Sequence, residues 1–450
     1  MANGVVPLTA TRPATSIAGR RFGALPAGGP ARPSGGPPEV MVQTGIHMNE
    51  HHPSGAKSPI ISAATDTLKE SAMWTIANSR VDHRLLFAFA VVVVSACSCA
   101  KNADGQSSDE TATVPATQPE VWLCAGDRIA ELLDTDAEWP FVQQHLTGIK
   151  LYIGQLATNR RRPAESSTDR IRQIAELVKN HNLKVAVELG GCLDFSPLDD
   201  TAGEWSARRE LAAMENFYAV GGKVDYLDID GPIRRLLHPQ NRRDGKKFES
   251  IEGAADELVD ALRIHRAAHP ETQYWLLTNF PNWGYRGDVS YHARGPQRQD
   301  YGDYDTVVRT VLKKLSEAKI PLEGVTVDNP YDYLIGEHRS VKLPDPTKVD
   351  WLGRVRTYED FVRQNGLSFN LIANSERGGH ESDERFYKES LQMVDAYLKA
   401  GGKPTRWFVQ TWYQYPKQLL PESAPHSIIS LTKAVIQRTR GTGKLSVNGS

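Results

Sequence analysis

The chain has 450 residues, with 53 Lys and Arg against 54 Asp and Glu, and its formal net charge is −1. This balance argues against a nucleic-acid-binding protein, which would carry a basic excess or stripe, so we expect no nucleic-acid partner. A hydrophobic fraction of 40% excludes a chain that is disordered throughout. Four cysteines are too few for a disulfide scaffold.

Residues 1–72 show no long apolar periodicity. Residues 21–40 include five Gly and five Pro, and such a segment buries too little apolar surface to offset its ordering entropy. We therefore expect 1–72 to be a disordered leader. Because a signal-like pattern begins at Met73, we interpret Met73 as the natural start; the alternative is a genuine long leader.

Residues 73–100 resemble a signal peptide. Arg80 and Arg84 precede the apolar run 85–96, which is of signal-peptide length and too short for a comfortable transmembrane helix. The run ends in Val94-Ser95-Ala96-Cys97, which resembles the bacterial lipobox. We expect lipidation of Cys97 and export, as a periplasmic or outer-membrane lipoprotein held at the membrane by its lipid, or as an extracellular protein. Ordinary cleavage after Ala100 and an uncleaved anchor are the alternatives.

Residues 101–119, rich in Ser, Thr, Asp, Ala and Pro, predict a flexible linker. From residue 120, short β-branched or apolar runs alternate with helical periods such as Ile171, Ile174 and Val178. Ser167, Thr168 and Asp303 are the expected helix N-caps. The expected strands are 121–125, 149–156, 184–189, 224–229, 274–278, 324–328, 368–373 and 407–411.

Eight strand–helix repeats predict an α/β fold, a (β/α)₈ TIM barrel over residues 120–440. The competing fold is a doubly wound open sheet, which would carry a Gly-rich phosphate loop after its first strand. Ala125-Gly126-Asp127-Arg128 follows the first expected strand and lacks that pattern.

The active site of such a barrel forms at the C-terminal ends of its strands. Asp228 and Asp230 should face the same way because side chains alternate along a strand, and two carboxylates held together raise one pKa. A protonated acid beside an ionised partner is what glycosidic cleavage requires. The alternative is that one Asp caps the following helix or pairs with an arginine such as Arg234. The expected catalytic residues are Asp228, Asp230, Glu376 and Asp328.

Amides and aromatic residues follow the same strand ends. Aromatic faces suit the apolar faces of sugar rings, while acids and amides hydrogen-bond the hydroxyl groups; the alternative is that several rings pack between helix ends. The expected substrate-binding residues are Glu188, Asn279, Trp283, Asn329, Tyr331, Asn374, Gln410, Trp412 and Tyr413.

The segment Asp225-Tyr226-Leu227-Asp228-Ile229-Asp230-Gly231-Pro232 resembles the strand-4 signature of chitinase-like family 18 glycoside hydrolases, Asp-x-x-Asp-x-Asp-x-Glu. Pro232 stands where that family has its catalytic Glu. The chain also resembles the retaining glycosidase clan with a strand-7 nucleophile and a strand-8 aromatic, at Glu376 and Trp412, but lacks that clan's Asn-Glu on strand 4. The two resemblances imply a carbohydrate-active barrel rather than a named activity.

We expect a glycoside hydrolase that acts on a polysaccharide or oligosaccharide without a cofactor or metal, with Asp230 or Asp228 as the acid. Glu376 would be the nucleophile or base, and Asp328 is the next candidate. One alternative is a glycan-binding barrel without catalysis, because of Pro232. The other is a metal-dependent sugar isomerase or hydrolase, whose ligands would be Glu188, Asp230, Glu376 and His380.

Overall fold

The computed structural model describes residues 118–134, 136–158, 167–190, 202–237, 250–286, 290–291, 303–338 and 343–441. The predicted leader, signal segment, Cys97 and linker residues 101–117 lie outside the described residues. Among the residues that are described, no helix has both the length and the apolar character needed to span a membrane.

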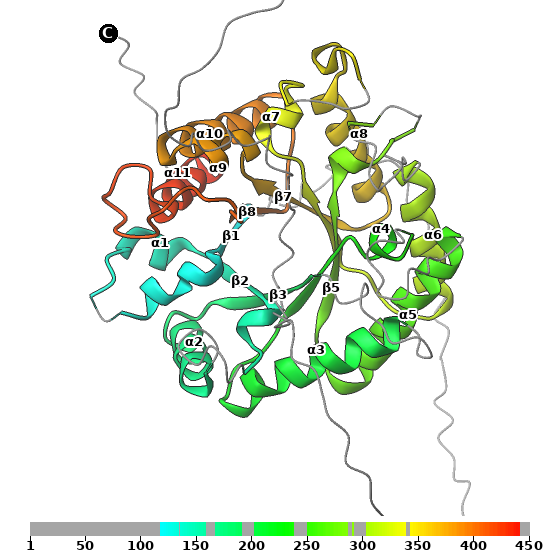
Figure 1. Ribbon diagram of the computed structural model, residues 1–450, viewed down its shortest axis with the longest axis horizontal. Helices are drawn as coiled ribbons and strands as arrows, with labels where there is room; N and C mark the ends of the chain where they lie inside the picture. The colour runs from blue at the N-terminus through cyan, green and yellow to red at the C-terminus, as the bar shows by residue number, and fades with distance from the viewer. Residues whose placement is uncertain are drawn as a thin grey trace, which may run out of the picture. The chain divides into compact units, whose positions relative to one another are not determined.

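Eight parallel strands close into a barrel in chain order, with β8 returning to pair with β1 (Figure 1). The strands are β1 (Glu120–Cys124), β2 (Gly148–Tyr152), β3 (Lys184–Gly190), β4 (Tyr226–Asp230), β5 (Gln273–Asn279), β6 (Gly324–Asp328), β7 (Ser368–Ala373) and β8 (Arg406–Gln410). The predicted (β/α)₈ barrel is therefore confirmed.

Helices follow every strand, and the long ones lie around the outside of the strands (Figure 1). The α-helices are α1 (Pro140–His145), α2 (Thr168–Asn180), α3 (Ala202–Ala219), α4 (Pro232–Leu237), α5 (Ile251–Ala268), α6 (Tyr304–Glu317), α7 (Tyr331–Leu334), α8 (Trp351–Gln364), α9 (Glu376–Glu381), α10 (Asp383–Lys399) and α11 (Ile428–Arg440). Short 3₁₀ helices are η1 (Gly126–Leu133), η2 (Ile153–Gln155), η5 (Phe280–Asn282) and η6 (Pro346–Lys348).

Alternation along each strand divides the core into two parts. Outward residues such as Val185 and Leu227 belong to the larger cluster that includes the helix side chains. Inward aromatic residues form a separate cluster inside the barrel, in which the Trp122 ring lies 5.5 Å from Trp275 and 5.7 Å from Phe408. The same parity places residues 150, 188, 228, 328, 374 and 410 on the inward side, nearer the C-terminal ends of their strands.

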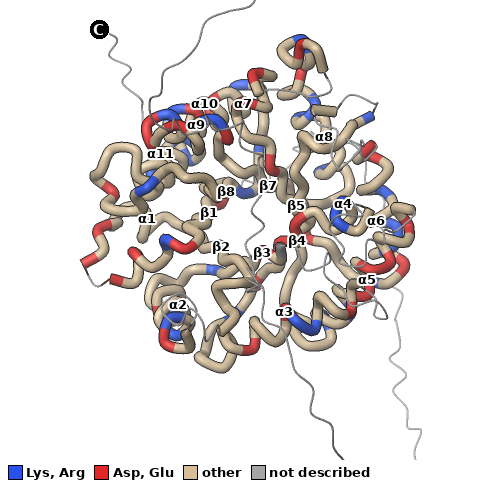
Figure 2. Tube along the Cα trace, in the orientation of Figure 1, with Lys and Arg blue, Asp and Glu red and all other residues tan. Residues whose placement is uncertain are grey.

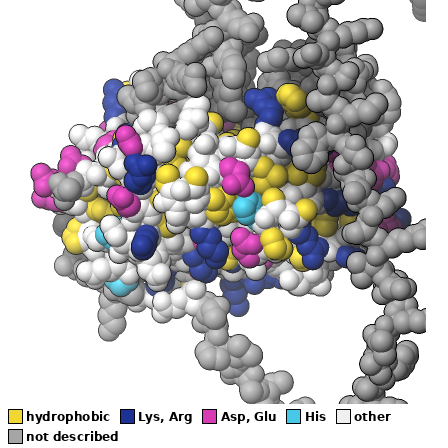
Figure 3. Space-filling view, turned by 90° about the horizontal axis from the view of Figure 1, so that it is seen from below, with side chains coloured by type: hydrophobic (Ala, Val, Ile, Leu, Met, Phe, Trp, Pro, Cys, Tyr) yellow, Lys and Arg dark blue, Asp and Glu magenta, His cyan; other side chains and the backbone are white. Residues whose placement is uncertain are grey.

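Arg406 fills the opposite end of the barrel. Its guanidinium contacts Glu120 Oε2 at 2.7 Å and Glu323 Oε1 at 3.1 Å, and it lies 4.9 Å from the centre of the Trp275 ring. Charged residues therefore occur along the central strands as well as on the helices (Figure 2). On the face seen in Figure 3, basic, acidic and hydrophobic side chains are interspersed.

Local sequence explains where the elements begin and end. Ser167 and Asp303 cap α2 and α6 as predicted, each accepting a backbone N–H from the first turn. The expected strand at 149–156 is too long. Gln155 Oε1 accepts the Tyr152 N–H at 2.7 Å, so the chain turns into η2 and the strand ends at Tyr152.

Candidate active site

Lys150 lies inside the barrel with a fully buried side chain. Its Nζ lies 2.8 Å from Glu188 Oε2 and 2.9 Å from Asp228 Oδ2. Burial opposes the charge on Lys150, yet the two carboxylates raise its pKa well above the ordinary lysine value. Burial also raises the pKa of Asp228 and of Glu188, against the opposing effect of Lys150. Asp228 is fully buried, and its Oδ2 contacts the Lys150 ammonium group.

Asp230 follows on the same strand and forms an ion pair with Arg235, whose Nε also donates to the Asp230 carbonyl at 2.9 Å. The sequence left open a pairing with an arginine, and the structure supplies one from the second turn of α4. Pro232 begins α4, where its fixed φ suits a first helical position. The other acid of the family-18-like segment, Asp225, lies at the opposite end of β4, where it accepts the Val185 N–H at 2.9 Å.

Asp328 ends β6 and is 3% exposed. Asn279 Nδ2 donates to Asp328 Oδ2 at 2.8 Å, and Asn374 Nδ2 donates to Oδ1 at 3.2 Å. Burial raises the pKa of Asp328 to about 8; the Asn374 amide opposes this, while the charges of Asp230, Glu376 and Glu188 add to it. Burial therefore disfavours the charged form of the Asp328 carboxyl, whereas the two amide hydrogen bonds that it accepts favour that form.

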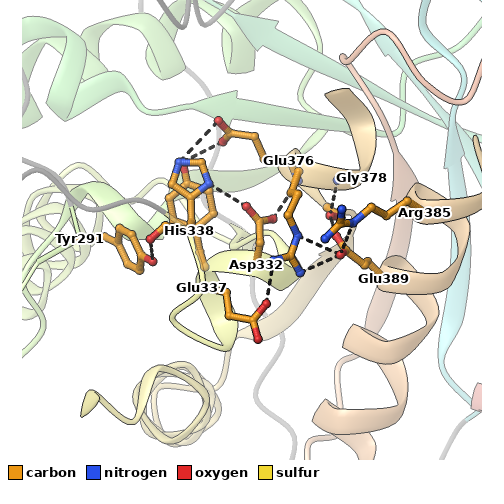
Figure 4. Close-up of polar contacts among 11 residues, drawn as sticks. Tyr291, Asp332, Glu337, His338, Glu376, Gly378, Arg385 and Glu389 are labelled. Carbon is orange, nitrogen blue, oxygen red and sulfur yellow. Dashed lines mark hydrogen bonds and ion pairs between the residues drawn. The ribbon is translucent and has the colours of Figure 1, made fainter. Parts of the chain in front are cut away.

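Glu376 begins α9, directly after β7, and its environment is different (Figure 4). Tyr333 OH donates to Glu376 Oε2 at 2.7 Å, and His338 Nε2 lies 3.9 Å from Oε1. The Glu376 backbone N–H donates to Asp332 Oδ1 at 3.0 Å. Hydrogen bonds donated to a carboxylate favour its charged form. Both carboxyl groups therefore accept hydrogen bonds, and they differ in burial: Asp328 is 3% exposed, whereas the Glu376 side chain is 12% exposed.

The α9 helix is anchored to the barrel by buried charge. Ser375 accepts the Gly378 N–H at 2.9 Å and donates to Glu389 on α10. Glu389 Oε1 also accepts from Arg377 Nη2 at 2.7 Å and Arg385 Nε at 2.9 Å (Figure 4). These contacts fix the direction in which Glu376 leaves the strand.

Glu188 and Gln410 meet at the floor of the site. Gln410 Nε2 donates to Glu188 Oε2 at 2.9 Å and to Tyr152 OH at 3.3 Å. Gln410 Oε1 and Asn374 Oδ1 are buried and meet no donor among the described residues, and Asn329 Nδ2 meets no acceptor there. These amide groups remain able to bind the hydroxyl groups of a ligand.

The aromatic candidates differ in exposure. Trp412 is half-buried, packs against the cluster inside the barrel, and lies 5.0 Å from the Tyr413 ring. Burial raises the pKa of Tyr413, and the charges of Glu376 and Asp328 add to this effect. Tyr331 is partly buried, and its backbone N–H donates to the Asn374 carbonyl at 3.0 Å. Trp283 is only 3% exposed and packs in the outer core 5.2 Å from Tyr304, so we assign it to packing rather than to substrate binding.

Sequence reasoning missed Lys150, Asp332, Tyr333 and His338. Lys150 carried a signal, because strand alternation places it on the same face as Tyr152, inside the barrel. Asp332, Tyr333 and His338 lie in and after the short helix α7, where no periodicity marks which side chains meet. Only the folded path of this segment brings them to Glu376.

Within the described ranges, no three His, Cys, Asp or Glu side chains are grouped so as to hold a metal ion. His380, the histidine of the metal-dependent alternative, is exposed, and its ring lies 5.1 Å from that of Tyr413.

No protein-family model matches the chain, and no curated protein matches it. Solved structures with a similar fold include an intracellular xylanase from Thermoanaerobacterium saccharolyticum, 12% identical, covering 66% of this chain and 89% of that chain with a TM-score of 0.42. An endo-β-1,4-mannanase from Thermotoga petrophila is 8% identical, with coverages of 73% and 78% and a TM-score of 0.43. Active domain 2 of a chitinase from Pyrococcus furiosus is 12% identical, with coverages of 72% and 97% and a TM-score of 0.38. These neighbours are glycoside hydrolases, but likeness at this level carries no argument about activity.

Proposed function

We propose that the barrel hydrolyses glycosidic bonds of a polysaccharide. The observation that carries this proposal is the pair of unlike carboxyl groups at the C-terminal ends of β6 and β7. Asp328 is buried, and burial raises its pKa to about 8, whereas Glu376 accepts a hydrogen bond from Tyr333. A carboxyl group whose pKa is raised by burial, together with a second carboxyl group at the same end of the barrel, can supply the acid and the base or nucleophile of glycoside cleavage.

In the proposed reaction Asp328 donates its proton to the leaving oxygen. Glu376 attacks the anomeric carbon directly or removes a proton from the attacking water. Asn279 and Asn374 hold the Asp328 carboxyl by donating to its two oxygens. Lys150 keeps Glu188 and Asp228 in place below the reacting groups. The proposed acid is therefore Asp328 on β6, whereas the sequence predicted Asp228 or Asp230 on β4.

Trp412 supplies the proposed sugar platform. Its half-buried ring packs against the aromatic cluster inside the barrel and lies next to the Tyr413 ring. An aromatic ring at the C-terminal end of the strands can cover the apolar face of a sugar ring. The buried amide oxygens of Gln410 and Asn374 meet no donor in the described part of the chain. The site is thus suited to a substrate with many hydroxyl donors.

The test is reducing-end release by the full chain across a panel of polysaccharides. We expect release from at least one substrate, and a loss of at least about a hundredfold in D328N and in E376Q. The matched controls are D360N and E317Q, which change exposed carboxylates on outer helices; both should retain the parental rate. Glycan binding without release by the parent chain would instead support the non-catalytic alternative.

We also propose that the protein is exported and lipidated at Cys97, on the basis of the lipobox-like sequence at the end of the apolar run. Mass spectrometry of the mature N-terminus tests this. A lipid-modified cysteine at the mature N-terminus is expected, and the lipid should be absent from the C97A variant. An unmodified N-terminus that includes residues before Cys97 would contradict it.

A further inference from the structure

The two chain segments that carry the proposed catalytic carboxyl groups are joined by hydrogen bonds. Asp328 ends β6 and the chain continues into α7, whereas Glu376 follows β7 and begins α9. Asn374 Nδ2 donates to Asp328 Oδ1 at 3.2 Å, and the Tyr331 N–H donates to the Asn374 carbonyl at 3.0 Å. The segment after β6 therefore contacts the segment after β7 from the strand ends onward.

Asp332 continues this contact at the start of α9 (Figure 4). Its Oδ1 accepts the Glu376 backbone N–H at 3.0 Å, although the two residues are 44 positions apart in the sequence. This N–H belongs to the first turn of α9, where no carbonyl group of the helix itself accepts it. Because Asp332 is fully buried, its carboxylate rather than solvent provides the acceptor.

Tyr333, the next residue of α7, holds the side chain of Glu376. Its hydroxyl donates to Glu376 Oε2 at 2.7 Å. The Tyr333 ring is 4% exposed and packs in a cluster with Tyr291 and Trp351, with 4.8 Å between the centroids of the two tyrosine rings. Two adjacent residues of α7 thus hold Glu376 at both ends, Asp332 by the backbone and Tyr333 by the carboxyl group.

Asp332 is itself fixed by the residues that follow α7. Its Oδ2 lies 2.7 Å from His338 Nδ1, and its carbonyl accepts the N–H groups of Glu337 at 2.9 Å and His338 at 3.0 Å. Arg377, which follows Glu376, donates from Nη1 to Glu337 Oε2 and from Nη2 to Glu389 Oε1, both at 2.7 Å. These contacts tie the α7 segment to α9 and to α10.

We propose that Asp332 and Tyr333 are positioning residues that hold the Glu376 carboxyl group at a fixed place relative to Asp328. This inference rests on the proposed function, in which the two carboxyl groups act on one glycosidic bond. One short segment then carries the proposed acid and also holds the proposed nucleophile or base. The separation of two such carboxyl groups decides how a glycosidic bond is cleaved, and a displacement of about 1 Å in an active site can cost about a hundredfold in rate.

Hydrogen–deuterium exchange of the full chain, followed by mass spectrometry of a peptide covering residues 374–378, tests the backbone contact. In D332A the Glu376 N–H loses its acceptor and should exchange at least about tenfold faster than in the parent. D332N keeps an oxygen at the Oδ1 position and should exchange like the parent. D350A is the matched control, because Asp350 Oδ1 accepts the Gly353 N–H at 2.8 Å at the start of α8; it should leave this peptide unchanged. Equal exchange in D332A and the parent would overturn the role of Asp332.

Kinetics on a polysaccharide that the parent hydrolyses separate positioning from a merely structural role. D332A should lose about a hundredfold in kcat with KM unchanged, because Asp332 acts through Glu376 rather than on the sugar. D332N should restore kcat to within about threefold of the parent, since the neutral His338 ring can accept at Nδ1 from the new amide. An equal loss of kcat in D332N and D332A would contradict positioning.

Y333F keeps the ring in its cluster and removes only the hydroxyl group, so it also serves if D332A does not fold. Its kcat should fall about tenfold with KM unchanged, and a parental kcat would overturn the role of Tyr333. If the parent hydrolyses no polysaccharide, the proposed function fails while the exchange experiment still decides whether Asp332 holds Glu376. If hydrolysis continues at the parental kcat in D332A and Y333F, only the positioning role fails.

Discussion

Replacing Lys150 by Met should strongly destabilise the barrel. The ammonium group is fully buried and lies 2.8 Å and 2.9 Å from two carboxylate oxygens. At an effective dielectric constant of about 20, each contact is worth about 6 kcal/mol before desolvation is counted. Burial of the three groups offsets most of this, so the net loss should be about 3–5 kcal/mol, as when one partner of a buried pair is removed.

The loss in K150M should depend on pH in a definite direction. Without Lys150, the ionised forms of Glu188 and Asp228 lose their buried positive partner. Their pKa values therefore rise further above those of the unfolded chain. A raised pKa means that the folded state binds more protons, and the unfolding free energy therefore falls as pH rises. The deficit should be largest at alkaline pH and should shrink towards pH 4.

Urea unfolding at several pH values, or the Tm, measures this effect. The expected decrease in Tm is about 5–8 °C for a domain of this size. K184M is the matched control, because Lys184 pairs with Glu120 at the partly exposed, opposite end of the barrel; it should lose no more than about 1 kcal/mol. A loss in K150M no larger than in K184M, or one that does not change with pH, would refute the reasoning.

Three further variants probe the mouth of the barrel. In the D328N variant the unfolding free energy should fall less between about pH 4 and pH 8 than in the parent chain, because the raised pKa of Asp328 predicts proton binding by the folded chain in that window; parallel urea titrations would contradict this assignment. G379A would place a Cβ 2.3 Å from the Tyr413 ring, so the ring must move, and kcat/KM should fall about tenfold with the fold retained; unchanged kinetics would show that the Tyr413 position does not matter. W412A should weaken glycan binding by about tenfold, measured by calorimetry, with W205A as an outer-helix control.

The sequence was sufficient to predict the barrel because each strand carries its own pattern. Outward positions such as Val185 and Leu227 are apolar, turn signals follow, and helices such as α2 have clear caps. The strand boundaries were less accurate, since they depend on side chains that bond the backbone. Gln155 ends β2 in this way, and Asp225 bonds the neighbouring strand just before β4 begins.

The site was only partly predictable. The alternation of side chains along β4 correctly predicts that Asp228 and Asp230 face the same side of the strand. It does not predict which basic residues pair with them. Lys150 and Arg235 come from a different strand and a short helix, and they neutralise the two acids separately. The different surroundings of Asp328 and Glu376 arise from residues that only the closed barrel brings near them, so their assignment needed the fold.

The most direct test of the account is the pH dependence of reducing-end release by the full chain. The account predicts a rate that falls above about pH 8, as Asp328 loses its proton, and no comparable limb in the residual activity of D328N. A parental rate that stays constant well above pH 8, or a D328N variant as active as the parent, would contradict the claim that Asp328 is the acid.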